Sequence, residues 1–218
     1  MTHRQLYTIL AFAGAIVWWQ AAWIGWVISE HDRLQDALAH RAQIEVLMTD
    51  RIETVNKKAP AERIARAILD ASDRHRIDPL LVLSVIETES HYEPQAVGLA
   101  GERGLMQITR STAKVLELPW EDAFYIEQNI EAGSKYLAQH LRNNGHAGIA
   151  RYNGGSRAYA EQVLARYQHF CQTLNVRSLD KVCKESRQSQ VSSPTSGQST
   201  VWEKMSKNKF SWTPGEVR

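Results

Sequence analysis

The chain has 218 residues, of which 43% are hydrophobic and 23% are charged, so it is long enough for one ordinary domain with additional segments. Its formal net charge is only +2, and basic and acidic residues are mixed along the sequence, which argues against a nucleic-acid-binding protein. The eight histidines are scattered and form no HExxH pattern, so we predict neither a metal site nor a cofactor.

The N-terminal segment is uncharged from Gln5 to Ser29, and the 23 positions over 6–28 are mostly apolar. A helix needs about 20 such residues to cross a bilayer, and the last two tryptophans of the segment, Trp23 and Trp26, suit a membrane interface. We therefore predict that residues 1–29 are a single-pass transmembrane anchor in the inner membrane, with the rest of the chain in the periplasm. The alternative is a cleaved signal peptide, whose apolar region is shorter, about 7–15 residues.

Residues 30–58 are polar and helix-prone, with a broken apolar stripe that includes Leu34, Leu38, Met48 and Ile52. Charged residues interrupt any strict heptad, so the pattern does not establish a coiled coil. We predict a helical stalk or linker, and a dimerising helix is the alternative.

Residues 59–183 carry few strand signals, and their apolar periodicity is helical. The expected helices lie over about 60–74, 79–90, 111–116, 128–142, 146–152 and 156–170. We predict one mainly α-helical domain with a single core. Cys171 and Cys183 lie at its end, and they either form a disulfide in an oxidising compartment or remain two buried free thiols.

The composition changes from Ser186 to the end of the chain, where Ser, Gln, Thr, Lys, Gly and Pro dominate. Such a segment cannot bury enough apolar surface to fold alone. We therefore predict that residues 184–218 are a disordered tail. Its aromatic residues, Trp202, Phe210 and Trp212, are hypothetical docking points for a partner.

The most informative predicted helix is 79–90, which begins after a good N-cap, Asp78, and is apolar on nearly every side as far as Glu87. Glu89 lies in its last turn and shares a face with the apolar residues three, four and seven positions before it. A carboxyl held against apolar groups has a raised pKa, which lets a glutamate act as a general acid near neutral pH. Glu87 points elsewhere, because residues two apart do not share a helix face. The alternative is that both glutamates simply end a helix at the surface.

Three glycines, Gly98, Gly101 and Gly104, follow this helix and precede Leu105-Met106-Gln107-Ile108. Glycines so placed permit positive φ and close backbone approach. Together with the preceding Glu-Ser pair, the stretch resembles the lytic transglycosylases of the goose-type lysozyme superfamily, and the resemblance covers about half of the chain. The matching residues are Glu89-Ser90, Pro94, Ala96, Gly101, Gly104-Leu105-Met106-Gln107, Thr112-Ala113, Asn129-Ile130-Glu131-Ala132-Gly133, Tyr136-Leu137 and Ala150-Arg151-Tyr152-Asn153-Gly154-Gly155.

The resemblance implies a lysozyme-like helical domain that cleaves the β-1,4 bond between N-acetylmuramic acid and N-acetylglucosamine in peptidoglycan. It implies one catalytic glutamate, Glu89, which protonates the leaving oxygen and then accepts the proton of the muramic acid 6-hydroxyl. The substrate's own N-acetyl group stabilises the oxocarbenium-like centre, and the product has a 1,6-anhydro end. Most glycosidases differ from this scheme in using two carboxylates.

The resemblance also implies five substrate-binding residues near the catalytic glutamate. Gln107 lines the groove, Met106 forms its apolar wall or else fills the core, and Tyr152 places its hydroxyl near the reacting sugar. Asn153 orders the loop that carries the tyrosine, and Ser90 is a hydrogen-bonding residue at the helix end rather than a catalyst. The alternative for Tyr152 is a ring packed on the core with its hydroxyl at the surface.

The sequence departs from the family pattern at three places. Gly98 stands where many members have a serine that can contact the substrate N-acetyl group, so that contact is not assured here. Glu102 stands where many members have alanine, and Thr109-Arg110 replace the usual Met-Pro. Glu102 is either a second carboxylate that assists attack by water or a solvent-facing loop residue.

Three functions are therefore compatible with the sequence. The first is a membrane-anchored lytic transglycosylase that acts on peptidoglycan glycan strands, with local wall opening for a secretion, conjugation or phage apparatus as a possible setting. The second is a hydrolytic muramidase, and the third is a non-catalytic peptidoglycan-binding assembly protein. The presence of Glu89, Gln107 and Tyr152 argues against the third.

Overall fold

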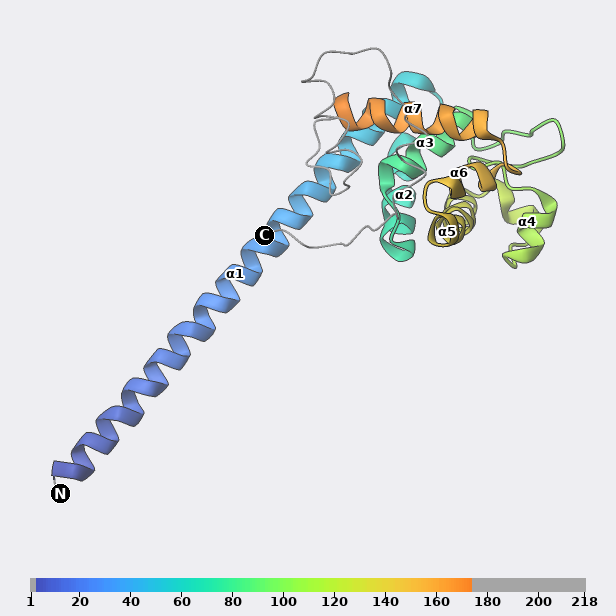
Figure 1. The fold of residues 1–218 in the computed structure, drawn as a ribbon. Coiled ribbons are helices and arrows are strands. Elements are labelled where there is room, and N and C mark those ends of the chain that lie inside the picture. Colours follow the sequence, from blue (N-terminus) through green and yellow to red (C-terminus); the bar gives the residue numbers. More distant parts are fainter. Residues whose placement is uncertain (1–2, 174–218) are drawn as a thin grey trace, which may run out of the picture. The chain divides into compact units, whose positions relative to one another are not determined.

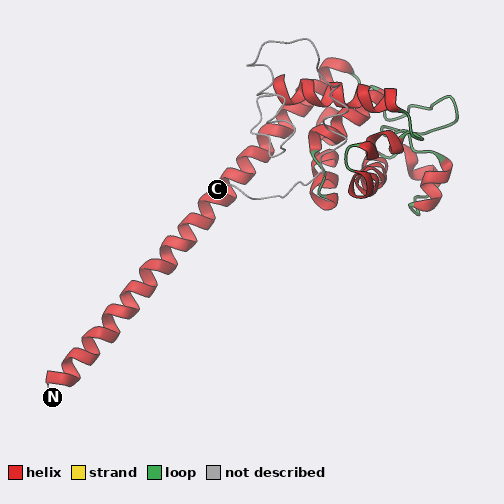
Figure 2. Ribbon diagram, viewed as in Figure 1, coloured by secondary structure: helices red, strands yellow, loops and turns green. Residues whose placement is uncertain are grey.

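The computed structural model describes the backbone of residues 3–173 and the side chains of residues 18–173. Its elements follow one another along the chain (Figure 1) in the order α1 His3–Val55, α2 Ala61–His75, α3 Pro79–Ser90, α4 Arg110–Val115, the 3-10 helix η1 Trp120–Phe124, α5 Ile126–Asn144, α6 Ala147–Tyr152 and α7 Arg157–Thr173. Over these residues Figure 2 shows helices and loops without strands, and only isolated β-bridges join Arg103 to Val97 and to Ile108. The predicted mainly α-helical fold is confirmed.

The chain divides into two compact units, Met1–Ala42 and Gln43–Arg218, and α1 runs through the boundary. Among the residues searched, no helix has the length and apolar character needed to cross a membrane. The predicted transmembrane anchor is therefore not supported by the described residues, and the side chains of residues 1–17 lie outside the description.

The second unit is built around α3, in which every residue from Leu80 to Glu87 is buried. Helix α3 packs against α2 and α7, and α5 packs against α2, α6 and η1. The side chain of Asp78 caps α3 by accepting a hydrogen bond from the Leu80 backbone N–H over 2.8 Å, as the sequence predicts. A second oxygen of Asp78 accepts from the Tyr167 hydroxyl over 2.9 Å, so the start of α3 is also fixed to α7.

The last turns of α1 belong to this second unit. Met48 and Ile52 are fully buried in its core, and Ile44 is 8% exposed. The unit thus begins at Gln43, upstream of the boundary predicted at residue 59, because the end of the apolar stripe assigned to the stalk packs inside the domain.

Helix α7 ends the described part of the chain. Cys171, in its last turn, is buried and disulfide-bonded. Cys183 and the predicted tail over 184–218 lie outside the described residues.

Candidate active site

The end of α3 is joined to the glycine-rich loop that follows it by Ser90. Its hydroxyl, which has one proton to donate, lies 2.8 Å from the Leu105 carbonyl and 3.1 Å from the Ile86 carbonyl. Ser90 therefore occupies a hydrogen-bonding position between the helix and the loop. Its predicted contact with substrate stays a prediction.

Backbone hydrogen bonds within the loop and close packing against neighbouring residues fix its conformation. Arg103 and Ile108 exchange two backbone hydrogen bonds, each of 3.0 Å. Gly104 has a φ of +75°, and a Cβ at this position would overlap the Ala123 carbonyl and the Asn129 side chain. Both reasons for a glycine, positive φ and close approach, thus apply at residue 104.

Asn129 on α5 holds the glycine motif against the core. Its Oδ1 accepts a hydrogen bond from the Met106 backbone N–H over 2.7 Å, and its Nδ2 donates to the Ala123 carbonyl over 2.6 Å. The side chain of Met106 is fully buried, and it fills the space that Gly133 leaves on α5. Of its two predicted places, Met106 therefore occupies the core in this structure.

Gln107 is held by the loop backbone. It has a φ of +48°, and its Nε2 donates to the Gly104 carbonyl over 2.8 Å. Its Oε1 faces Gly98, since a Cβ at that position would lie 2.6 Å away. The amide is thus fixed at the position where the sequence predicts a groove-lining residue, and contact with substrate stays a prediction.

Tyr152, at the end of α6, donates a hydrogen bond from its hydroxyl to the Met106 carbonyl over 2.7 Å. Its ring lies 5.5 Å from that of Tyr136, centre to centre. Burial, and then the nearby Glu89 carboxyl, raise the pKa of Tyr152 well above its usual value. The tyrosine therefore lies near Glu89, but its hydroxyl is bound to backbone. Asn153, the next residue, is exposed, and its side chain lowers the pKa of the Glu89 carboxyl.

Glu89 is partly buried, and the resulting loss of water raises the pKa of its carboxyl to about 7. The nearby Tyr159 hydroxyl and the Asn153 side chain oppose this increase, whereas the negative charge of Glu102 adds to it. A carboxyl with this pKa exchanges its proton readily at neutral pH, so it can donate a proton in one step and accept one in the next. This is the electrostatic state that the apolar face of the helix predicts.

Tyr159 on α7 is a site residue that the sequence analysis did not identify. Its hydroxyl is buried and has no hydrogen-bond partner of normal geometry, yet it lies close enough to Glu89 to lower the pKa of that carboxyl. Its ring is stacked with that of Tyr152, with 6.5 Å between centroids and 12° between planes. In the sequence, Tyr159 occupies an ordinary inward position of a helix, and no local pattern connects it with a residue so far upstream.

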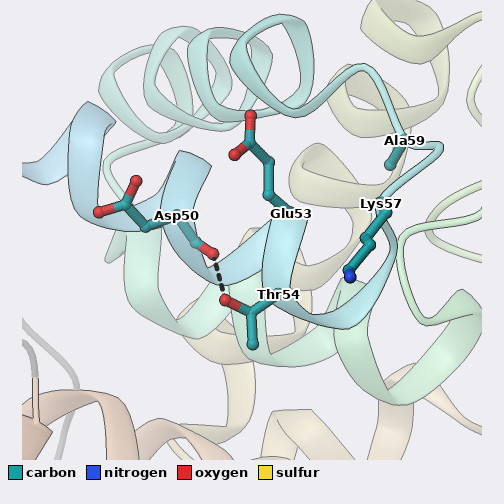
Figure 3. Close-up of a pocket in the computed structure, with 5 residues that line it drawn as sticks. All are labelled: Asp50, Glu53, Thr54, Lys57 and Ala59. Atoms are coloured by element: carbon teal, nitrogen blue, oxygen red, sulfur yellow. Dashed lines mark hydrogen bonds between the residues drawn. The ribbon is translucent and has the colours of Figure 1, made fainter.

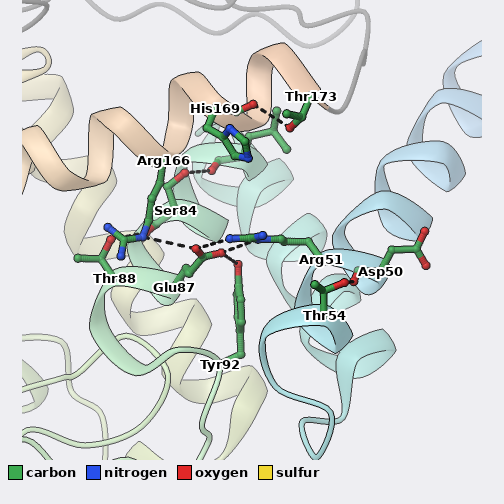
Figure 4. Close-up of polar contacts among 11 residues, drawn as sticks. Asp50, Arg51, Thr54, Ser84, Glu87, Thr88, Tyr92, Arg166, His169 and Thr173 are labelled. Atoms are coloured by element: carbon green, nitrogen blue, oxygen red, sulfur yellow. Dashed lines mark hydrogen bonds and ion pairs between the residues drawn. The ribbon is translucent and has the colours of Figure 1, made fainter.

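Glu87 has a different environment, which Figure 4 shows. Its side chain is 8% exposed and accepts two hydrogen bonds from the Arg51 guanidinium, at 2.9 and 2.6 Å, and one from the Tyr92 hydroxyl at 2.7 Å. Arg166 on α7 lies 3.5 Å away. Burial alone would raise the pKa of Glu87, but these donors and the two positive charges outweigh it and lower the pKa. Glu87 is therefore an ion-paired structural carboxylate.

Two open surface hollows lie elsewhere on the second unit, and Glu89 lines neither. The first has a volume of about 630 Å³ and is drawn in Figure 3, with the lining residues Asp50, Glu53, Thr54, Lys57 and Ala59. The second, of about 340 Å³, has Lys58, Glu93 and Tyr125 among its lining residues. Within the described residues, no group of three or more His, Cys, Asp or Glu is arranged to hold a metal ion. The groups around Glu89, and not either of these two hollows, therefore mark the candidate site.

The segment that contains Glu89 is similar to known proteins. Residues 66–171 match the family model described as the transglycosylase SLT domain. The chain is 46% identical over 77 residues to the membrane-bound lytic murein transglycosylase F of Desulfosudis oleivorans, an alignment that covers 35% of this chain and 16% of the relative. It is 36% identical over 88 residues to the transglycosylase of Enterobacteria phage PRD1, covering 39% of this chain and 32% of the relative.

A third relative is the membrane-bound lytic murein transglycosylase C of Edwardsiella ictaluri, 33% identical over 105 residues, with 39% of this chain and 29% of the relative covered. The chain thus aligns with less than a third of the length of each of these relatives. Among solved structures, an inactive mutant of the lytic transglycosylase Slt from Pseudomonas aeruginosa superposes with a TM-score of 0.45 at 19% identity, covering 52% of this chain and 24% of that one. The segment that matches the transglycosylase SLT domain contains Glu89, the glycine motif and the Tyr-Asn pair, so this part of the chain is similar to the lytic transglycosylases.

Proposed function

We propose that the protein is a peptidoglycan lytic transglycosylase that cleaves the β-1,4 bond between N-acetylmuramic acid and N-acetylglucosamine. The observation that carries this proposal is the state of Glu89. Its carboxyl lies at the end of a buried helix inside the SLT domain and has a pKa of about 7. Glu87, the other glutamate of the same helix, is paired with two arginines, so it is not available as a proton donor.

In the proposed reaction, protonated Glu89 gives its proton to the glycosidic oxygen as the bond from that oxygen to C1 breaks. The substrate N-acetyl group stabilises the positive charge that develops at C1. Glu89, now a carboxylate, accepts the proton of the 6-hydroxyl while that oxygen bonds to C1 and forms the 1,6-anhydro ring. A pKa near neutrality suits both halves of this cycle, because neither proton transfer is strongly uphill.

The surrounding residues support this use of Glu89. Asn153 and Tyr159 act on the Glu89 carboxyl directly, and Tyr152 joins the loop after α6 to the glycine motif through the Met106 carbonyl. We propose that Gln107 and Tyr152 hold the sugar on either side of the reacting bond. Ser90 holds the glycine-rich loop in position relative to α3, and Asn153 does the same for the loop after α6.

The setting is a separate part of the proposal. Two of the relatives are named as membrane-bound enzymes, and a third comes from phage PRD1. Together with the uncharged N-terminal segment, these names motivate action on the periplasmic wall, with local wall opening for a secretion, conjugation or phage apparatus as the broader role. Fractionation of cells that express the full-length chain tests attachment: the protein should sediment with the inner membrane and resist extraction at high salt, and recovery in the soluble fraction would contradict it.

The catalytic proposal is tested by incubating the full-length protein with purified peptidoglycan and identifying released muropeptides by mass spectrometry. We expect anhydro-muramyl products from the wild type and none above background from Glu89→Gln in the same incubation. Products with reducing ends would support a hydrolytic muramidase instead, a reaction for which Glu102 is the second carboxylate. A folded protein that binds the wall and releases nothing would favour the binding or assembly role.

A further inference from the structure

Gly98 and Glu102 occupy one space in the loop after α3. A Cβ built on Gly98 would overlap Glu102 Oε2 and would lie 3.2 Å from Glu102 Cδ and 2.6 Å from Gln107 Oε1. The Glu102 carboxyl thus fills the volume that a side chain at position 98 would need. The two departures from the family pattern are therefore a matched pair, in which one side chain takes the place of another.

The Glu102 carboxylate is held at this place but retains free acceptor capacity. Its Oε2 accepts one hydrogen bond, from the Ala100 backbone N–H over 3.1 Å. No lysine or arginine forms an ion pair with it in the part of the chain that the structure describes. A carboxylate has about four lone-pair positions and no proton to give, so a ligand that meets Glu102 must supply an N–H, an O–H or a positive charge.

Glu102 also lies within electrostatic reach of the catalytic carboxyl, because its charge contributes to the raised pKa of Glu89. It is half-buried, and the Gln107 amide lies beside it. A negative charge fixed next to the reacting centre stabilises positive charge that forms there, and such preorganised groups are among the strongest contributions to catalysis. The N-acetyl group of the reacting sugar provides both the N–H donor and the developing positive charge.

We propose that Glu102 is a substrate-binding carboxylate that accepts a hydrogen bond from the acetamido N–H of the N-acetylmuramic acid being cleaved. The inference rests on the proposed function, since it names a group of that substrate. Where a serine hydroxyl at position 98 would donate a hydrogen bond, Glu102 accepts one, so the N-acetyl group is held by its N–H and its carbonyl oxygen is left free to approach C1.

The reaction then proceeds with atoms and charges in balance. The N-acetyl carbonyl oxygen bonds to C1 as the glycosidic bond breaks, and Glu89 protonates the leaving oxygen. The resulting five-membered ring is positively charged, and part of this charge lies on the N–H that donates a hydrogen bond to Glu102. The 6-hydroxyl oxygen next bonds to C1, the bond from C1 to the carbonyl oxygen breaks, and Glu89 takes the hydroxyl proton. Glu102 keeps its charge throughout, and no water is consumed.

The test compares the full-length wild type with Glu102→Gln, which keeps the shape of the side chain and removes its charge. Glu93→Gln is the matched control, because exposed Glu93 also accepts one hydrogen bond from a backbone N–H two residues away, that of Gln95 at 3.1 Å. We expect Glu102→Gln to lower kcat for muropeptide release about 100-fold, within the range for one preorganised electrostatic group, while KM changes little. Glu93→Gln should behave as the wild type.

A second readout does not depend on turnover. The thiazoline of N-acetylglucosamine is a stable analogue of the cyclic intermediate, and chitotriose is an uncyclised reference ligand. By isothermal titration, Glu102→Gln should bind the thiazoline at least tenfold more weakly than the wild type and should bind chitotriose equally well. Should Glu102→Gln be unstable, Glu102→Ala and Gly98→Ser/Glu102→Ala decide, since the double variant restores a hydrogen-bonding group in the vacated space and should exceed Glu102→Ala in kcat.

The outcomes separate the inference from the proposed function. If the wild type releases no muropeptides, the proposed function is wrong and the inference falls with it. If the wild type and Glu102→Gln have equal kcat and equal affinity for the thiazoline, only the inference is wrong. Reducing-end products that disappear in Glu102→Gln would also overturn it, because Glu102 would then be the base that activates water.

Discussion

The two glutamates of α3 are separated by one residue and have opposite electrostatic environments. Burial acts on both carboxyls and raises the pKa of each. At Glu87 the hydrogen bonds and charges of Arg51, Tyr92 and Arg166 reverse this effect, so the pKa is lowered. At Glu89 no cation among the described residues opposes the effect of burial, a second carboxylate adds to it, and the pKa reaches about 7. One helix thus carries an ion-paired carboxylate and a carboxyl of raised pKa, and the difference lies in the partners and not in the helix.

The largest effect is expected from a substitution of Glu89. Glu89→Gln should lower the rate of muropeptide release by about 10²–10⁴-fold, the usual contribution of a general acid–base group. Its melting temperature should not fall, because glutamine resembles the protonated form that burial favours. Initial rates and thermal unfolding of the purified variant measure both quantities. Full activity in a folded Glu89→Gln protein would refute the assignment.

The two carboxyls should also differ in how their contributions to stability depend on pH, because their pKa values shift in opposite directions on folding. The pKa of Glu89 is raised from 4.5 to about 7 on folding, so its contribution to stability is present below pH 4.5 and is lost as the pH rises to about 7. The shift corresponds to about 3 kcal/mol. Glu87, with a lowered pKa, contributes stability above its unfolded pKa and loses it as the pH falls.

Denaturant titrations of the wild type and Glu89→Gln between pH 4 and pH 8 test the first half of this prediction. The free energy of unfolding of the wild type should decline relative to the variant as the pH rises. A difference that does not change with pH would mean that Glu89 titrates normally. The rate of strand cleavage should also fall above about pH 7, as the general acid loses its proton.

A smaller effect is expected from removal of the ion pair between Arg51 and Glu87. Arg51→Met removes the bidentate partner of Glu87 and leaves a mostly buried carboxylate with weaker support. Loss of one partner of a buried pair costs about 3–5 kcal/mol, and because the Arg51 side chain is 30% exposed we expect about 2 kcal/mol. The double variant Arg51→Met/Glu87→Met should recover most of this loss, since it leaves no unpaired charge. Urea titrations of the single and double variants supply the comparison, and equal stability of wild type and Arg51→Met would contradict it.

The smallest expected effect concerns Tyr159→Phe. The Tyr159 hydroxyl lowers the pKa of Glu89, so its removal should raise that pKa and move the alkaline limb of kcat/KM to higher pH. Stability should change by less than about 1 kcal/mol, because among the described residues the hydroxyl forms no hydrogen bond of normal geometry that the substitution would remove. Rate–pH profiles of both proteins measure the shift. An alkaline limb that does not move would mean that the hydroxyl has no influence on Glu89.

The sequence predicts those features of the site that follow from local rules. Asp78 and Pro79 mark the start of α3, and the 3.6-residue period places Glu89 on an apolar face away from Glu87. The positive φ of Gly104 follows from the glycine spacing. Each of these features depends on residues within about one helical turn or one tight loop, which is the range over which sequence patterns constrain geometry.

Features that depend on distant partners were not predicted. Arg51 was assigned to a stalk, yet it pairs with Glu87, 36 positions further along. The hydroxyl of Tyr152 donates to the backbone of residue 106, and Tyr159 reaches Glu89 from another helix. Nothing in the local pattern of Arg51 or Tyr159 distinguishes them from ordinary polar or core positions, and the motif that contains Tyr152 does not specify the hydrogen-bond partner of its hydroxyl. Their roles arise from tertiary packing, which one sequence does not specify residue by residue.

The burial of Met48 and Ile52 together with the Arg51 pair has a consequence for modularity. The match to the family model starts at residue 66, but the hydrophobic core of the unit includes side chains from the preceding helix, α1. A chimaera or truncation that starts at residue 66 would expose the core surface that Met48 and Ile52 cover. It would also leave Glu87 without its Arg51 partner. The compact unit that contains Glu89 starts at Gln43, so the end of α1 is as much a part of that unit as the helix that bears Glu89.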